Sequence, residues 1–175
     1  MTAPLAGLVF RGAAIEDAGR LAAVLVEGFH TYREFAPQDW RVPAVEDVAE
    51  VLAERLPKPT VWCLLAEQGS RVAGYVALLP AADARWPVSE PGLAHFWMLF
   101  VRASWWGSGL AGRLHEASRD AAVQRGFTAM RLFTPADQAR ARRFYEREGW
   151  TVAGAPFRDE EVGLSVVEYR RELLG

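Results

Sequence analysis

One stretch in the second half of the chain most constrains the fold, because it reads as strand, helix and strand in succession. Residues 93–101 form a nearly continuous apolar run, which is typical of a strand covered on both faces. Residues 109–125 carry apolar side chains at helical spacing, and Gly126 is a natural helix end. Residues 128–134 again favour a strand. A unit of this kind places its two strands parallel in one sheet, with the helix packed on one face.

The remaining patterns extend this unit toward both termini. Residues 61–67 and 71–79 have strand patterns, and Gln68, Gly69 and Ser70 between them favour a hairpin with antiparallel pairing. The other expected elements are a strand at 8–11, helices at 17–29 and 45–56, and strands at 150–153 and 164–170. The sequence therefore predicts an α/β (α+β) protein with a mixed, mostly antiparallel twisted sheet of about six to seven strands and helices on both faces.

The last helix has recognisable end signals. Thr134, Pro135 and Asp137 resemble a capping box with proline at the first helical position, which predicts that the helix begins there. Gly149 is expected to end it. The segment 154–163, between the last two predicted strands, is predicted to be a loop.

Composition narrows the class of protein further. The 175 residues suit one domain spanning 1–175, and the net charge of −2 argues against a nucleic-acid binder. Cys63 is the only cysteine, so no intramolecular disulfide can form. No apolar run approaches the roughly 20 residues of a membrane span, and the first residues lack a signal-peptide pattern. We expect a cytoplasmic protein with no membrane partner.

The connection between the strand at 93–101 and the following helix is rich in glycine. Gly107, Gly109 and Gly112 allow backbone amides to approach an anion, and the start of a helix attracts negative charge. The glycines by themselves are equally compatible with a flexible connection. The segment also spells the dinucleotide-binding pattern G-x-G-x-x-G. That interpretation is disfavoured because residues 102–106 separate the pattern from its strand, and no acidic residue ends the next strand.

Two motifs in this part of the chain resemble the GNAT superfamily of N-acetyltransferases. The family signature Q/R-x-x-G-x-G/A begins about five residues after the fourth strand, and residues 106–111 read WGSGLA in that place. Gly109 and Ala111 match, whereas Trp106 departs from the usual glutamine or arginine. A second signature, N-x-x-A-x-x-F-Y-x-x-x-G-F, is similar to QARARRFYEREGW at residues 138–150, with Gln138 in place of asparagine.

This resemblance implies transfer of an acetyl group from acetyl-CoA, as cosubstrate, to a primary amine by direct attack in a ternary complex, with no metal. It assigns to the cofactor Leu99, Phe100, Val101, Trp106, Gly107, Ser108, Gly109, Leu110, Ala111, Gly112 and Gln138. Between residues 102 and 147 the chain has nine arginines and four acidic residues, a local basic excess that fits an anionic cofactor.

The resemblance also suggests two catalytic residues. Tyr145 matches the family tyrosine whose phenol donates to the leaving thiolate, and this role is favoured over the alternative of a core aromatic residue. His95 lies where the family often has a glutamate acting as base, and an ordinary histidine pKa near 6.5 would suit that task. The alternative is a buried structural histidine. Because direct attack needs no enzyme nucleophile, Cys63 is expected to be a core residue.

The acceptor is expected to be a small-molecule or peptide amine, and a protein lysine also stays open. In this family variable segments build its pocket, here 30–41, 83–91 and 156–163. Aromatic residues of the first segment, together with the carboxylates of Glu34, Asp39 and residues 159–161, would suit a cationic amine. All three segments could equally be polar surface loops. The alternative function is a non-catalytic acyl-CoA-binding sensor of the same fold. A homodimer is compatible with either function.

Overall fold

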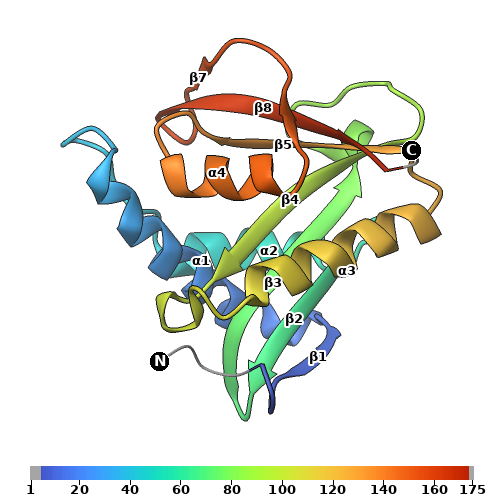
Figure 1. Ribbon diagram of the computed structural model, residues 1–175. Helices are drawn as coiled ribbons and strands as arrows, with labels where there is room; N and C mark the ends of the chain where they lie inside the picture. The colour runs from blue at the N-terminus through green and yellow to red at the C-terminus, as the bar shows by residue number, and fades with distance from the viewer. Residues whose placement is uncertain (1–4, 174–175) are drawn as a thin grey trace.

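The apolar run at residues 93–101 forms β4 (Leu93–Val101), which lies in the middle of an eight-stranded sheet (Figure 1). The computed structural model describes residues 5–173, so residues 1–4 and 174–175 of the expected domain lie outside it. The strand order is β1-β2-β3-β4-β5-β8-β6, with β7 also paired to β8. Every pairing is antiparallel except that of β4 with β5. The sequence predicts this mixed sheet but misses β7, which lies in the segment expected to be a loop.

The other strands are β1 (Val9–Gly12), β2 (Trp62–Gln68), β3 (Arg71–Pro80), β5 (Ala129–Pro135), β6 (Thr151–Val152), β7 (Phe157–Asp159) and β8 (Leu164–Glu172). The helices are α1 (Ala18–His30), α2 (Val45–Arg55), α3 (Leu110–Gln124) and α4 (Ala139–Arg147). Short 3-10 turns occur at Ile15–Asp17, Thr31–Glu34, Ala81–Asp83 and Ala103–Trp105. Within residues 5–173, none of these helices has the length and apolar character needed to cross a membrane.

Helices cover both faces of the sheet, and each face has its own core. Helices α1 and α2 pack on one face around Leu21, Leu52 and Tyr75, and α3 and α4 pack on the other around Leu114 and Trp150 (Figure 1). Cys63 belongs to the α1/α2 side, and burial raises the pKa of its thiol to about 12. At neutral pH that thiol is protonated and unsuited to nucleophilic attack.

The two parallel strands at the centre diverge soon after they meet. Pairing joins Leu93–His95 of β4 to Ala129–Arg131 of β5, whereas β4 continues to Val101. The register of β4 against β3 also shifts at a β-bulge, where Trp97 has no partner between two paired residues. A bulge bends a strand and changes the face to which its side chains point. Trp97 and Met98 both pack on the α1/α2 side as a result.

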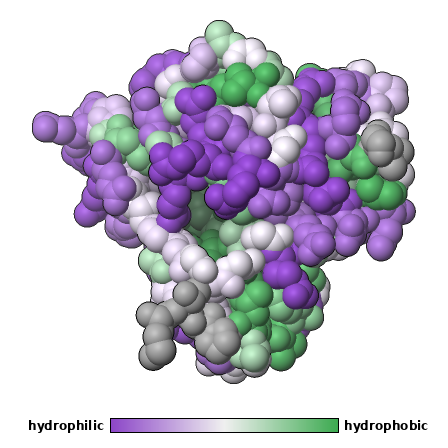
Figure 2. Space-filling view, in the orientation of Figure 1, coloured by the Kyte–Doolittle hydropathy of each residue, from purple (hydrophilic) through white to green (hydrophobic). Residues whose placement is uncertain are grey.

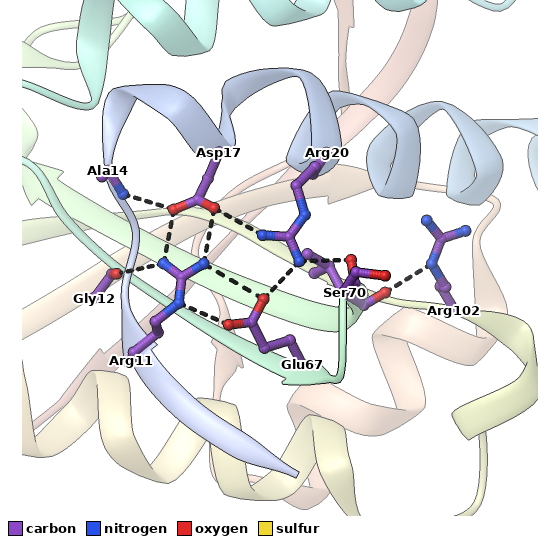
Figure 3. A network of polar contacts seen from close by, with 9 residues as sticks. Arg11, Gly12, Ala14, Asp17, Arg20, Glu67, Ser70 and Arg102 are labelled. Carbon is purple, nitrogen blue, oxygen red and sulfur yellow. Dashed lines mark hydrogen bonds and ion pairs between the residues drawn. The ribbon is translucent and has the colours of Figure 1, made fainter.

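A network of charged side chains holds β1, α1 and β2 together at the sheet edge (Figure 3). The buried carboxylate of Asp17 accepts bonds from the guanidinium of Arg11 at 2.8 and 2.9 Å, from that of Arg20 at 3.0 Å, and from the backbone amide of Ala14 at 2.9 Å. Glu67 of β2 bonds to both arginines. These bonds, chiefly those from Arg11, lower the pKa of Asp17 to about 2, so its charge is retained at neutral pH.

The predicted start of the last helix is wrong. Residues predicted to begin the helix continue β5 instead, because Thr134 pairs with Val167 and Pro135 pairs with Val166 of β8. Helix α4 begins only at Ala139, and no side chain caps its N-terminus. Long-range strand pairing therefore overrides the local capping pattern in residues 134–137.

Candidate active site

A cavity of about 590 Å³ opens where β4 and β5 diverge. Its walls come from both strands, from the turn and first residues of α3, from α4, and from the end of α1. Leu99 and Val101 belong to the α3/α4 side of the sheet, whereas Trp97 and Phe100 belong to the α1/α2 side. The cavity is therefore lined from both faces. Figure 2 shows a hollow with an apolar floor and a hydrophilic rim between α4 and the start of α3.

All but one of the residues assigned to the cofactor from the sequence line this cavity. The exception is Ser108, whose hydroxyl donates to the carbonyl of Trp105 at 2.6 Å and accepts from the amide of Leu110 at 3.2 Å. Ser108 thus uses its side chain to shape the turn itself. Its role toward a cofactor would be limited to its backbone.

The glycine-rich turn has the geometry of an anion site. Gly107 and Gly109 have φ values of 77° and 88°, a left-handed conformation that glycine adopts without strain. Gly109 is the N-cap residue of α3, and no atom lies within 4 Å of the point where a Cβ would stand. The first amides of a helix have no acceptor within the helix. The amide of Leu110 donates to Ser108, so those of Ala111 and Gly112 are the ones available to an anion in the open cavity.

Three basic cavity residues of α4 are not among those that the sequence assigns to the site. Arg140, Arg143 and Arg147 line the cavity and supply positive charge to its α4 wall. The sequence shows the basic excess in this part of the chain, but not which of its arginines face the cavity. The signal lies in their spacing, because residues three and seven positions apart share one face of a helix.

Tyr145 also lines the cavity and is 9% exposed. Its ring packs edge-on against Phe96 and Trp150, with centroids 6.1 and 6.0 Å away. Burial raises the pKa of its phenol, and the nearby Tyr32 adds to the increase. The Tyr145 phenol is therefore protonated at neutral pH and can act as a donor toward the cavity.

His95 is not among the cavity-lining residues. It lies where Leu93–His95 is still paired with Ala129–Arg131, and its side chain is buried with the ring of Phe133 5.8 Å away. Burial, together with the positive charges of Arg131 and Arg55, lowers its pKa to about 3. The expectation of an ordinary pKa near 6.5 is wrong for this residue. A histidine that is so weakly basic and so placed does not match the base role suggested by the sequence.

Between about pH 6.5 and pH 3, His95 is neutral in the folded state and protonated in the unfolded state, which makes stability depend on pH. The unfolded chain takes up a proton near pH 6.5, whereas folded His95 does so only near 3, so acidification favours unfolding. We expect the free energy of unfolding to fall below pH 6.5, with His95 contributing about 1.4 kcal/mol per pH unit. His95→Gln should remove that part of the slope in urea unfolding measured at pH 7, 6 and 5. His30→Gln, at an exposed position, is the matched control.

The same variant tests the catalytic expectation for His95. The acidic limb of kcat/KM should persist in His95→Gln, because the native histidine does not titrate there. Loss of that limb would restore His95 as the base and contradict the structure.

The segments expected to surround the acceptor do meet near the cavity, and the carboxylates of the third segment are engaged. The indole of Trp40 donates to the carbonyl of Val162 at 2.7 Å, joining the first and third segments. Asp159 and Glu161 both pair with Arg85 of the second segment. Glu160 pairs with Arg158. Tyr32 lines the cavity, whereas Phe35 and Trp40 pack on Tyr32 from behind. The acidic residues of the third segment are therefore already paired, whereas Glu34 and Asp39 of the first segment are exposed.

Beside the glycine-rich start of α3, the sheet splits between β4 and β5. The model of the acetyltransferase (GNAT) family matches residues 25–150, and the chain belongs to that family. No curated protein matches the chain.

Several solved structures share the fold. An N-acetyltransferase from Staphylococcus aureus Mu50 aligns with a TM-score of 0.72 and 16% identity, covering 95% of this chain and 98% of that one. The protein yncA from Salmonella typhimurium, solved with acetyl-CoA, gives 0.69 and 18%, covering 96% and 95%. The paia N-acetyltransferase from Thermoplasma acidophilum, solved with coenzyme A, gives 0.64 and 16%, covering 92% and 97%. At this identity the likeness establishes the fold.

Proposed function

We propose that this protein transfers an acetyl group from acetyl-CoA to a primary amine by direct attack within a ternary complex. The observation that carries the proposal is the cavity between β4 and β5, which joins the glycine-rich turn to the Tyr145 phenol. Membership of the GNAT family supports it, as do the structural relatives solved with acetyl-CoA or coenzyme A.

The cavity offers each substrate its own side of the sheet. The glycine-rich turn and the α4 arginines lie on the α3/α4 side, where the pyrophosphate would bind. The diverging part of β4, including Leu99 and Val101, would hold the arm that carries the thioester. The acceptor would enter past Tyr32 on the α1 side and meet the thioester between the strands. Holding both reactants in this way supplies much of the rate acceleration.

The reaction requires a proton at the sulfur and a neutral amine. As the amine attacks the thioester carbon, the C–S bond breaks and the departing thiolate needs a donor, which the Tyr145 phenol would provide. Among the described residues that line the cavity, Glu148 alone carries a carboxylate, and it lies beside His115 just beyond α4. The amine would therefore lose its proton to solvent, and kcat/KM would follow the amine's own ionisation.

The lining also favours one class of acceptor. Trp97, Met98, Phe100 and Phe133 form apolar walls beside Tyr32. The carboxylates at 159–161 are held in ion pairs with arginines, and among the described residues that line the cavity only Glu148 is acidic. A primary amine with an apolar or aromatic substituent fits this lining better than a polyamine, because a second charge would be desolvated without a partner.

A panel of amines tests this function. We expect coenzyme A and acetyl-CoA to raise the melting temperature, since a ligand that binds only the folded state stabilises it, and NAD to have no effect. With acetyl-CoA present, apolar primary amines should release free thiol faster than polyamines do. Stabilisation by coenzyme A without thiol release from any amine would favour the non-catalytic sensor. A shift with NAD and none with coenzyme A would contradict the proposal altogether.

A further inference from the structure

The tryptophan that opens the glycine-rich turn has a side chain whose polar group is already used. The indole N–H of Trp106 donates to the carbonyl of Val101, the last residue of β4, at 2.9 Å. Trp106 lines the cavity and is 40% exposed, a high value for so large an apolar side chain. The bond engages the only polar group of the indole, so any further contact of the ring is made through an aromatic face.

Arg140 of α4 lies on that face. Its guanidinium carbon is 3.1 Å from the centroid of the Trp106 ring, and Arg140 lines the same cavity. Trp106 follows β4, whereas α4 follows β5. The contact therefore joins the two walls that separate where the central strands diverge. An arginine stacked by its face leaves the N–H groups along its edge free to donate to another group.

The charge of Arg140 is also uncommitted. Within residues 5–173, no carboxylate oxygen lies within 4.0 Å of its guanidinium, and Glu34 acts on it only at longer range. Two other arginines, Arg102 and Arg142, differ in this respect, because Arg102 pairs with Glu27, and Arg142 donates to the phenol of Tyr169 and the carbonyl of Ala136. Arg140 is thus a free cation beside the turn whose amides face the cavity.

We propose that Trp106 and Arg140 form a clasp across the cleft, in which the indole holds the guanidinium against the pyrophosphate of coenzyme A. The backbone amides of the glycine-rich turn would bind the pyrophosphate from one side and Arg140 from the other. Charge-assisted bonds from a guanidinium to phosphate oxygens are among the stronger polar contacts in proteins. The inference rests on the proposed function, since it assumes that coenzyme A is the ligand.

Three probes distinguish the phosphates that Arg140 could serve. We expect Arg140→Ala to raise the Kd for coenzyme A about 10- to 100-fold. It should raise the Kd for 3′-dephospho-coenzyme A, which keeps the pyrophosphate, by the same factor. Binding of pantetheine, which has no phosphate, should not change. Calorimetry on the full chain measures all three, and Arg140→Gln serves if the alanine variant is poorly folded.

The matched control is Arg125→Ala, which removes one positive charge from an exposed position on the same basic segment. It should leave all three Kd values near those of the unmodified protein. Trp106→Ala tests the clasp directly, because it removes the platform and leaves the cation. We expect the combined Trp106→Ala and Arg140→Ala variant to lose less affinity than the product of the two single effects, since residues that act together are not additive.

Several results would overturn the clasp. An unchanged Kd for coenzyme A in Arg140→Ala would remove Arg140 from the cofactor site. A loss confined to coenzyme A would place the guanidinium on the 3′-phosphate, and an equal loss for pantetheine would indicate a general disturbance of the cavity. Fully multiplicative effects of the two substitutions would separate Trp106 from Arg140. Failure of the unmodified protein to bind coenzyme A would instead defeat the proposed function.

Discussion

Gly109→Glu should abolish coenzyme A binding in a protein that still folds. Gly109 is the N-cap residue of α3 and has open space in the direction of a side chain, so a carboxylate there would extend into the cavity. It would stand where the pyrophosphate meets the helix amides, and repulsion between like charges in a protein site costs several kcal/mol. We expect the Kd to rise by at least about 100-fold, measured by calorimetry.

The backbone conformation of Gly109 calls for a careful control. Its φ of 88° disfavours any side chain, and the strain costs about 1–2 kcal/mol whichever residue is introduced. Gly109→Ala carries the same strain without the charge. Comparable melting temperatures for the two variants, with coenzyme A binding lost mainly in Gly109→Glu, would assign the effect to the carboxylate. Normal affinity in a folded Gly109→Glu protein would place the pyrophosphate elsewhere.

Tyr145→Phe should lower kcat by about 100-fold while leaving the Kd for acetyl-CoA nearly unchanged. General acid catalysis contributes a factor of this size, and the substitution removes one hydroxyl with little change in packing. Because burial raises the Tyr145 pKa, the phenol stays protonated from pH 6 to 9, so its ionisation should impose no alkaline limb on kcat in that range. Steady-state rates with one amine across this range test both statements.

Tyr169→Phe provides the comparison for that experiment. The Tyr169 ring is 6.3 Å from that of Tyr145, but its phenol bonds to Arg142 and Glu146 and does not line the cavity. We expect this variant to lose some stability and to keep its kcat. Equal kcat values for Tyr145→Phe and the unmodified protein would make Tyr145 a packing residue.

The parts of the fold that could be predicted from the sequence are those set by local pattern. Three elements can be identified without knowledge of their neighbours. They are β4 from its continuous apolar run, the hairpin of β2 and β3 from its turn residues, and the start of α3 from the glycines before it. The predicted start of α4 is wrong because Pro135 is held in a strand by β8, which lies about thirty residues further along the chain. No local signal contains that pairing.

The candidate site shows the same division. Backbone positions in the turn and Tyr145 were placed by motif, and they do line one cavity. The burial of His95 and its lowered pKa could not be predicted from the sequence, because they depend on where β5 stops pairing with β4, a feature of the assembled sheet. The Trp106–Arg140 contact could not be predicted from the sequence for a related reason, because it joins residues from the two walls of a cleft that exists only after folding.

The short pairing between β4 and β5 also has a mechanical meaning. Strands β1 to β4 form one half-sheet and β5 to β8 form another, and three residue pairs make the backbone seam between them. Beyond that seam, side chains and the crossover helix α3 must keep the halves in register. A ligand bound between the half-sheets would contact both of them and so couple the movement of one half to that of the other. The opening that would admit the substrates thus lies where the two half-sheets have the fewest backbone hydrogen bonds between them.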